Sequence, residues 1–351
     1  MTPIRRHTLL NRERIKSALR MTAVLGRLTR RIVILLGIVT LGAASAGAQT
    51  QPAAWPTKPV RMVVAFPPGG LADVLTRMIQ PQLSEALGQP VTIDNRSGAS
   101  GNVAAVEVVR NGGDGHTFLI NVTTIESVNP LMFERMPFDS AKDLQHVALL
   151  ANTQLFLITR PTLEVNNLKE LVAHARANPG KLSYGSAGSG TTPHIAGELF
   201  KQNTGVFATH IPYRGAAPAI QDVMAGQIDF AFAPGTVFQN VKAGKLKLLA
   251  VASRQRTVNY PSAPAVAEEG FGNVFADTLF AVYAPAAMQA THVARMNREI
   301  NRILALPTIK ARFAEFGADA VPLSPAEVKA MVQAETQLFG PVVKTRGIKA
   351  D

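Results

Sequence analysis

Short apolar runs typical of strands alternate along the chain with segments in which apolar residues have helical spacing. This pattern predicts strands that alternate with helices. The segment 60–66 is rich in strand-forming residues and ends at Pro67-Pro68-Gly69-Gly70. The next segment has apolar residues at helical spacing and closes at Leu87-Gly88, and Pro81 is expected to kink or interrupt that helix. The same reasoning predicts strands over 91–93, 117–122, 155–159 and 182–186, and helices over 102–110, 168–177, 193–202, 291–305, 308–316 and 324–339.

This alternation predicts an α/β protein in which mainly parallel sheets are covered by helices. The chain has 351 residues, more than twice the ~150 residues typical of one domain, so two domains are expected. Hydrophobic residues make up 47% of the chain and charged residues 17%, a composition too apolar for a disordered protein.

Two strand–loop–helix junctions are the strongest candidates for a binding site. The first is 66–73, where Gly69-Gly70 separates a strand from a helix, and the second is 184–194, which is rich in glycine, serine and threonine. In such loops backbone N–H groups face outward and the helix dipole favours an anion. Because ligands bind beyond the carboxyl ends of parallel strands, the two loops predict a site for anionic groups that needs no buried lysine or arginine.

Most enzyme and metal-site patterns are missing from the sequence. There is no cysteine, and the seven histidines have neither His-x-x-x-His nor His-Glu-x-x-His spacing, so we predict no metal site and no cofactor. The glycines around Ser186 and Ser189 are out of register with a nucleophile elbow. A periplasmic serine hydrolase that uses Ser186 or Ser189 with His194 is kept as the alternative to a binding protein. Asp73 and Asp229 are interpreted as a first-turn carboxylate and a turn residue, because nothing pairs them as general acid and base.

The positive charge of the chain is concentrated in its first 48 residues. The formal net charge is +12, which by itself would suggest a nucleic-acid or membrane partner. Residues 1–48 hold nine of the 36 basic side chains and one of the 24 acidic ones, so 27 basic and 23 acidic groups remain, a net charge of +4. Arg30-Arg31, the apolar run 32–41 and Ala46-Gly47-Ala48 predict a signal peptide cleaved near Ala48, and hence a protein exported from the cytoplasm with no nucleic-acid partner. Met21 is an alternative start, and export by the Sec or the twin-arginine route stays open.

Eleven different short motifs follow one another over some 300 residues of the chain. They lie at 55–60, 67–70 with Asp73, 95–102, 114–117, 129–131, 178–182, 185–194, 197–200, 213–215, 225–229 and 266–270. In this order they resemble the Bug family, the periplasmic solute receptors of tripartite tricarboxylate transporters.

This resemblance implies a two-lobed type II periplasmic-binding fold that closes on a small carboxylate and delivers it to membrane transporter subunits. Lobe 1 is expected to comprise 49–151 plus 277–351, lobe 2 to be the inserted segment 152–276, and the crossings between them to form a hinge. The protein is expected to be a monomer, not an enzyme. Carried over residue by residue, the expected ligand contacts are Phe66, Pro67, Pro68, Gly69, Gly70, Asp73, Thr123, Thr124, Ser186, Ala187, Gly188, Gly190, Thr191, Thr192, His194, Tyr213 and Asp229.

Two positions depart from the family pattern. Leu71 stands where the family often has a small or polar residue, and Leu279 stands where it often has a large ring. Both changes predict a reshaped, more apolar pocket. A cytoplasmic transcriptional regulator shares the bilobal fold and is a further alternative, but it needs a helix-turn-helix within 1–48, which the apolar run 32–41 fits poorly.

Overall fold

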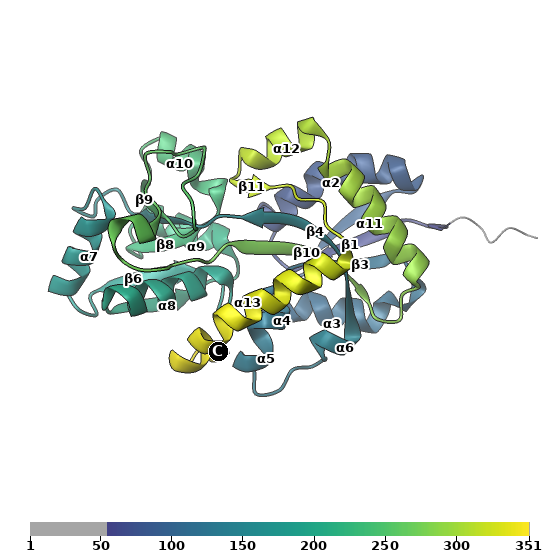
Figure 1. Cartoon of the computed structure of the whole chain (residues 1–351), viewed down its shortest axis with the longest axis horizontal. Coiled ribbons are helices and arrows are strands. Elements are labelled where there is room, and N and C mark those ends of the chain that lie inside the picture. The colour runs from purple at the N-terminus through teal and green to yellow at the C-terminus, as the bar shows by residue number, and fades with distance from the viewer. Residues whose placement is uncertain (1–54, 351) are drawn as a thin grey trace, which may run out of the picture. The chain divides into compact units, whose positions relative to one another are not determined.

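The strands of the protein form two separate sheets. The computed structural model describes residues 55–350, so the predicted signal peptide lies outside the described residues. One sheet has six strands in the order β11-β4-β10-β3-β1-β2, and the other has five in the order β7-β6-β8-β5-β9 (Figure 1). The strands are β1 (Val60–Val64), β2 (Val91–Asn95), β3 (Thr117–Val122), β4 (Leu144–Thr153), β5 (Phe156–Thr159), β6 (Leu182–Ser186), β7 (Ala208–Pro212), β8 (Phe230–Ala233), β9 (Lys247–Val251), β10 (Thr278–Pro285) and β11 (Ala318–Asp319).

Helices flank both sheets, as an α/β protein requires. The longer ones are α2 (Leu71–Leu87), α3 (Asn102–Asn111), α7 (Leu168–Ala177), α8 (Thr192–Thr204), α9 (Ala216–Ala225), α11 (Ala290–Leu304), α12 (Pro307–Ala314) and α13 (Pro325–Thr345). Short helical segments are α4 (Thr124–Ser127), α5 (Asn129–Met132), α6 (Ser140–Asp143), α10 (Phe238–Lys242), η1 (Ala99–Gly101), η2 (Gly112–Asp114), η3 (Gly235–Val237) and η4 (Val266–Glu269). Among residues 55–350 we find no helix that combines the length and the apolar character needed to cross a membrane.

Both sheets are mixed, whereas the sequence predicted mainly parallel ones. In the six-stranded sheet β1 runs parallel to β2 and β3, but β10 runs antiparallel to β3 and β4. In the five-stranded sheet β6 runs parallel to β7 and β8, but β5 runs antiparallel to β8 and β9. The connectivity explains the difference. The chain leaves the first sheet through β4 and returns to it through β10, so these two neighbours must point in opposite directions.

Strands β4 and β10 and helix α13 connect the two sheet-containing halves of the described chain (Figure 1). Helix α13 packs Val328 into the core of the six-stranded half, and Phe339 and Val343 into the core of the five-stranded half. Just beyond the helix, Arg346 Nε pairs with Glu198 Oε2 of α8 at 2.7 Å. The predicted hinge and lobe bounds at these crossings stay predictions.

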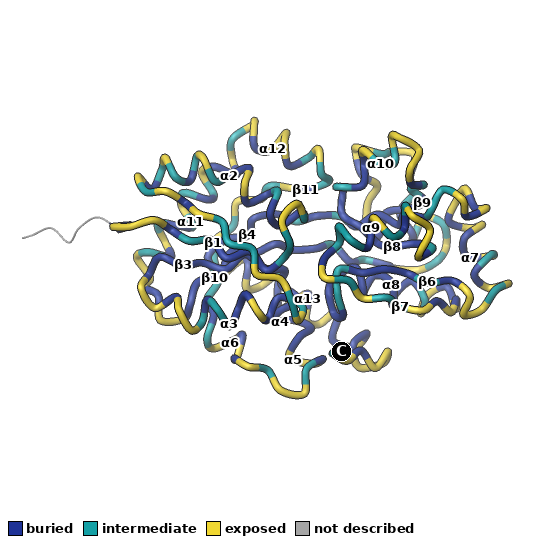
Figure 2. Tube along the Cα trace, turned by 180° about the vertical axis from the view of Figure 1, so that it is seen from behind, coloured by how far each residue is buried: buried dark blue, intermediate teal, exposed yellow. Residues whose placement is uncertain are grey.

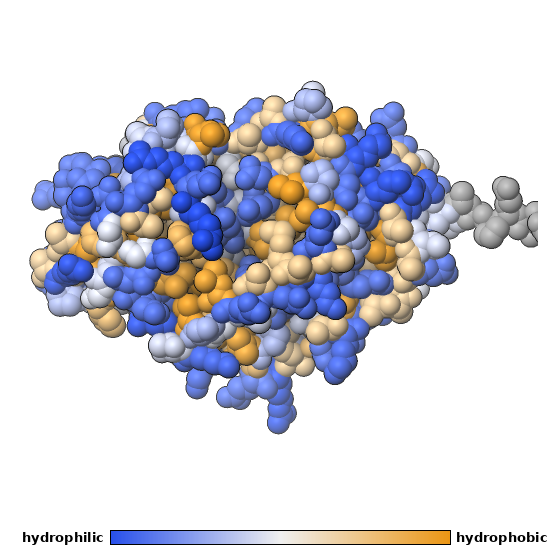
Figure 3. All heavy atoms as spheres, in the orientation of Figure 1, coloured by the Kyte–Doolittle hydropathy of each residue, from blue (hydrophilic) through white to orange (hydrophobic). Residues whose placement is uncertain are grey.

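A shallow hollow borders α13 where the two halves meet. Phe275, Leu279, Met331 and Leu338 contribute its hydrophobic lining, and Arg254 lies beside them. Figure 3 shows hydrophobic surface gathered beside α13 on this face of the molecule.

The central strands form the core of each half, and Figure 2 shows them within the buried part of the trace. Every residue of β3, β5, β8 and β10 is buried, as expected for strands covered on both faces. Helix α2 runs unbroken through Pro81, so the predicted interruption is wrong. Pro81 lies on the exposed side of the helix, while Ile79 and Leu83 hold the other side in the core. The carbonyl that proline leaves without a donor, that of exposed Arg77, can therefore bond to water.

Candidate ligand-binding site

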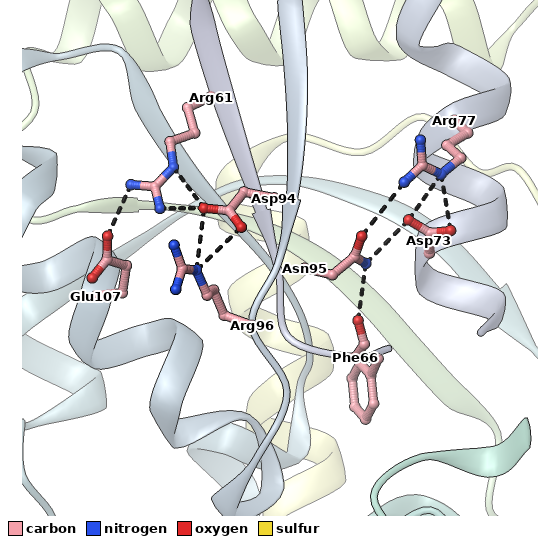
Figure 4. Close-up of polar contacts among 8 residues, drawn as sticks. All are labelled: Arg61, Phe66, Asp73, Arg77, Asp94, Asn95, Arg96 and Glu107. Atoms are coloured by element: carbon pink, nitrogen blue, oxygen red, sulfur yellow. Dashed lines mark hydrogen bonds and ion pairs between the residues drawn. The ribbon is translucent and has the colours of Figure 1, made fainter. Parts of the chain in front are cut away.

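The first glycine-rich loop joins β1 to α2 and is held in shape by Asp73. Asp73 Oδ2 accepts a hydrogen bond from Gly69 N at 3.0 Å and pairs with Arg77 Nε at 2.9 Å. Asn95 Nδ2 donates to Asp73 Oδ1 at 3.1 Å and to the Phe66 carbonyl at 2.9 Å (Figure 4). Burial by itself would raise the pKa of Asp73, but the hydrogen bonds from Arg77, Gly69 and Asn95 lower it below its ordinary value. Asp73 therefore stays ionised and holds the loop in shape through its bond to Gly69 N.

The second loop joins β6 to α8 and is held by Ser186 and two histidines. Ser186 Oγ donates to Gly188 O at 3.0 Å, accepts from Gly188 N at 3.1 Å, and lies 2.7 Å from His210 Nε2. His194 Nδ1 accepts from Gly190 N at 3.0 Å, and its ring stacks on that of His210 with 3.7 Å between the centroids. Burial lowers the pKa of His194 to about 4, so this ring is neutral and can accept.

A third loop, between β7 and α9, completes the arrangement. Gly215 N donates to Ala187 O at 3.1 Å, and Tyr213 N donates to Ser186 O at 3.2 Å, so this loop lies against the second one. Gly215 has φ +118°, and a Cβ placed there would lie only 2.9 Å from Pro67 Cδ in the first loop. The three loops, from both halves of the molecule, therefore touch one another.

The N-termini of α2, α8 and α9 meet at one pocket. Its space is about 550 Å³ including the open mouth. The N-cap residues Gly70, Thr191 and Gly215 provide no side-chain cap to these helices, and the Thr191 hydroxyl donates to Gly188 O instead. The lining residues are Phe66, Pro67, Gly70, Leu71, Ala72, Val122, Thr153, Leu155, Ala187, Thr191, Thr192, Pro193, Gly215, Ala216, Ala217, Pro234, Thr278 and Phe280.

The pocket lining includes four threonines and no ionisable side chain. The hydroxyls of Thr192 and Thr278 are buried and have no hydrogen-bond partner among residues 55–350. The first N–H groups of each helix also lack partners within the helix. Because buried polar groups are usually hydrogen-bonded, these amides and hydroxyls indicate a polar, anion-bearing ligand. The described residues contain no cluster of histidine or acidic side chains suited to a metal ion.

The structure brings part of the predicted site together. The predicted residues that line the pocket are Phe66, Pro67, Gly70, Ala187, Thr191 and Thr192. Gly188 and Tyr213 line an adjoining hollow, shared with Phe66 and Ala187 and bordered by Arg214. The predicted residues that line neither are Pro68, Gly69, Asp73, Thr123, Thr124, Ser186, Gly190, His194 and Asp229.

Several of these residues have structural partners that explain their position. Asp229 precedes β8, pairs with Arg160 Nε at 3.0 Å and accepts from Ser183 N at 2.8 Å, which places it at the opposite end of the sheet from the loops. In the predicted Thr123-Thr124 pair, the Thr123 hydroxyl donates to Glu335 Oε1 at 2.8 Å, and Ser127 Oγ donates to Oε2 of the same carboxylate at 2.6 Å. The pocket is instead reached by Val122, one residue earlier.

Sequence reasoning missed the residues that the crossing strands contribute. Thr278 and Phe280 of β10 line the pocket, whereas Leu279 between them faces the hollow beside α13, because successive residues of a strand point to opposite faces. Leu279 therefore does not line this pocket. Leu71 does line the pocket, as its position at the start of α2 suggested.

The alternative that pairs Ser186 with His194 does not match the hydrogen bonds of the loop. The imidazole beside Ser186 is that of His210, which the parallel pairing of β6 with β7 brings alongside. Ser186 is 1% exposed, and its hydroxyl bonds to both the N–H and the carbonyl of Gly188, so Ser186 serves as a turn residue of the loop.

Comparison with known proteins agrees with this geometry. A family model described as tripartite tricarboxylate transporter family receptor matches residues 75–348. The chain belongs to this receptor family. Protein BugT of Bordetella pertussis is 32% identical over 320 residues, which cover 90% of this chain and 98% of BugT.

Solved structures of similar proteins confirm the fold. The R. palustris protein Rpa4515, solved with adipate, is 34% identical with a TM-score of 0.82, and the match covers 85% of this chain and all of that one. MatC from Rhodopseudomonas palustris, solved with bound malate, is 26% identical with a TM-score of 0.78, and the match covers 82% of this chain and all of that one. The resemblance to the Bug family and the two-lobed α/β periplasmic-binding-protein fold are therefore confirmed.

Proposed function

We propose that this receptor is an extracytoplasmic solute-binding protein that captures a small carboxylate in the pocket between its two lobes and delivers it to a tripartite tricarboxylate-type membrane transporter. The observation that supports it most is the meeting of three helix N-termini at a pocket with no cationic side chain. Adipate and malate in related structures support a carboxylate as the anion.

Helix N-termini can supply the recognition of charge by themselves. Each carries partial positive charge and free N–H donors, and stabilises an anion by ~0.3–1 kcal/mol at an exposed site and by up to ~2 kcal/mol when partly buried. The N–H groups of Leu71 and Ala72 come from the six-stranded half, and those of Thr192, Ala216 and Ala217 from the five-stranded half. An anion that bonds to both sets stabilises the closed form over the open one. Closure is then the signal that a transporter reads.

The serine hydrolase alternative is not retained, because Ser186 is engaged in its own loop and does not line the pocket. We further propose that the protein is exported with cleavage near Ala48 and acts as a periplasmic monomer. Export predicts that the mature protein begins at Gln49, which mass spectrometry of the native protein would measure. A protein that keeps residues 1–48 would contradict export while leaving the binding proposal untouched.

Binding is tested by calorimetry on protein stripped of endogenous ligand by partial unfolding and refolding. Acetate, hexanoate, benzoate, adipate, malate and citrate form the panel. A ligand at 100 times its Kd should stabilise the fold by about 2.7 kcal/mol, which thermal unfolding would detect. If no acid in the panel binds or stabilises the protein at saturating doses, the proposed function is wrong.

A matched pair of variants tests the role of the amides. Ala216→Pro removes one N–H at the first position of α9, where proline is tolerated. Ala290→Pro makes the same change at the first position of α11, outside the pocket. Losing a hydrogen bond to a charged group costs ~1.5–3 kcal/mol, so the first variant should bind at least about tenfold more weakly and the second should bind normally. Equal affinities would refute recognition by the α9 N-terminus.

A further inference from the structure

The donors in the pocket are gathered in one place. Gly215 N bonds to Ala187 O at 3.1 Å, and a Cβ on Gly215 would meet Pro67 at 2.9 Å. The loops that begin α2, α8 and α9 are thus in mutual contact, and the first residues of all three helices line the same region, the pocket described above. One carboxylate can occupy that region and bond to both halves of the molecule.

The rest of the pocket is unsuited to a second charge. Leu71, Val122, Leu155, Pro234 and Phe280 contribute apolar side chains to its walls, and no lysine, arginine, histidine, asparagine or glutamine lines it. Taking a carboxylate out of water without charged or multiple donors is strongly unfavourable. Away from the helix N-termini, the side-chain donors are threonine hydroxyls, of which that of Thr278 lacks a partner among the described residues. Such a hydroxyl suits one neutral oxygen and does not neutralise an anion.

We propose that the physiological ligand is a monocarboxylate with an apolar body, either aliphatic or aromatic. This rests on the proposed function, because it names the class of acid that the same pocket takes. The carboxylate binds at the three helix N-termini, and the body lies against Leu71, Val122, Leu155 and Phe280. Dicarboxylates and tricarboxylates are disfavoured, because a second charge held within this pocket would have to enter its apolar part.

Leu71 is the residue that sets this preference most directly. It occupies the first position of α2, so it lies beside the proposed carboxylate site, and it is 4% exposed. Its side chain forms an apolar wall beside the first turn of α2. Burial against such a wall favours each added methylene of a ligand by about fourfold in affinity until the space is filled.

Hexanoate and adipate provide the decisive comparison, because both have six carbons and differ in whether the far end is a methyl group or a second carboxylate. Calorimetry on the ligand-stripped protein should show that hexanoate binds at least about tenfold more tightly than adipate, and that affinity rises from acetate through butyrate to hexanoate. Adipate binding as tightly as hexanoate, or more tightly, would overturn the inference while supporting the proposed function. If neither acid binds and the rest of the panel also fails, the proposed function itself fails.

The variant Leu71→Ser tests the wall separately, with Leu131→Ser as its control, since Leu131 is 43% exposed and does not line the pocket. Both variants should unfold cooperatively, which thermal unfolding without ligand would check. Leu71→Ser should lower the ratio of hexanoate to adipate affinity by at least about fivefold, and Leu131→Ser should leave that ratio unchanged. An unchanged ratio in a folded Leu71→Ser protein would contradict the role of the wall. If the ratio falls, Leu71→Ala distinguishes the loss of apolar contact from the gain of a hydroxyl.

Discussion

Replacing Gly215 by alanine should hold the two halves of the molecule apart. An alanine Cβ would lie 2.9 Å from Pro67 Cδ and 3.1 Å from Pro67 Cγ, whereas carbon atoms in ordinary contact are ~3.5–4.0 Å apart. The two loops must therefore separate by roughly 0.5–1 Å. Pro67 belongs to the six-stranded half and Gly215 to the five-stranded half, so this clash acts on the proposed closed form.

The size of the effect follows from ordinary overpacking costs. Overpacking of this kind costs ~1–3 kcal/mol, which corresponds to roughly 5- to 150-fold weaker ligand binding if the closed form bears the whole cost. The backbone at Gly215, with φ +118° and ψ 165°, lies in a region that only glycine adopts readily, and this adds ~1–3 kcal/mol to the loss of fold stability. The variant should thus show two separable losses, one in stability and one in affinity.

Gly226→Ala is the matched control for the loss of fold stability that comes from the backbone conformation. Gly226 ends the same helix at φ +76°, and the nearest atom to a Cβ there is Arg160 Cδ at 3.8 Å, an ordinary contact. We expect both variants to unfold at lower urea concentration, and only Gly215→Ala to bind hexanoate more weakly by calorimetry. If Gly215→Ala binds hexanoate as tightly as the parent protein, closure does not pass through the contact with Pro67 and the reasoning is refuted.

Three further predictions concern single side chains. Burial raises the pKa of Glu335 to about 7, although the hydrogen bonds that its carboxylate accepts oppose this shift. Protonated Glu335 therefore contributes about 3 kcal/mol to the free energy of unfolding below pH 4.5, and this contribution is lost as pH rises through 7. Glu335→Gln should remove this decline between pH 5 and pH 8 in urea unfolding, and an unchanged slope would contradict it. Despite burial, hydrogen bonds from Lys201, Arg346 and Tyr184 lower the pKa of Glu198 to about 2. Arg346→Ala should therefore cost ~1–2 kcal/mol at neutral pH, and the cost should fade as pH falls from 4.5 toward 2, whereas a cost independent of pH would point to lost packing. Thr278→Val should bind hexanoate up to about tenfold more tightly by calorimetry, because it removes a buried hydroxyl that this ligand cannot satisfy, and weaker binding would contradict that assignment.

The local features of the fold could be predicted from the sequence, because they depend on neighbours along the chain. The strand 182–186 and the helix 168–177 were predicted with the bounds that the structure shows. The loops around Gly70 and Thr191 were predicted as helix starts, and both N-termini open on the pocket. The glycines of each loop and the apolar spacing after them suffice for such a prediction.

What the sequence could not reveal depends on distant strands coming together. The start of α9 was missed as an anion site because Gly215-Ala216-Ala217 has no glycine pair, and only its contact with the other loops brings it to the pocket. Thr278 and Phe280 were missed because β10 enters the six-stranded sheet from the far half, next to β4. His210, rather than His194, lies beside Ser186 because β6 pairs with β7. Each of these outcomes is a tertiary neighbour that no local spacing encodes.

A crystal structure of the ligand-stripped protein soaked with hexanoate tests the central claim most directly. One carboxylate is expected within hydrogen-bond distance of amides at the N-termini of α2, α8 and α9, with the aliphatic chain against Leu71 and Phe280. A carboxylate bound instead beside Arg214 in the adjoining hollow, with the helix N-termini left to water, would contradict it.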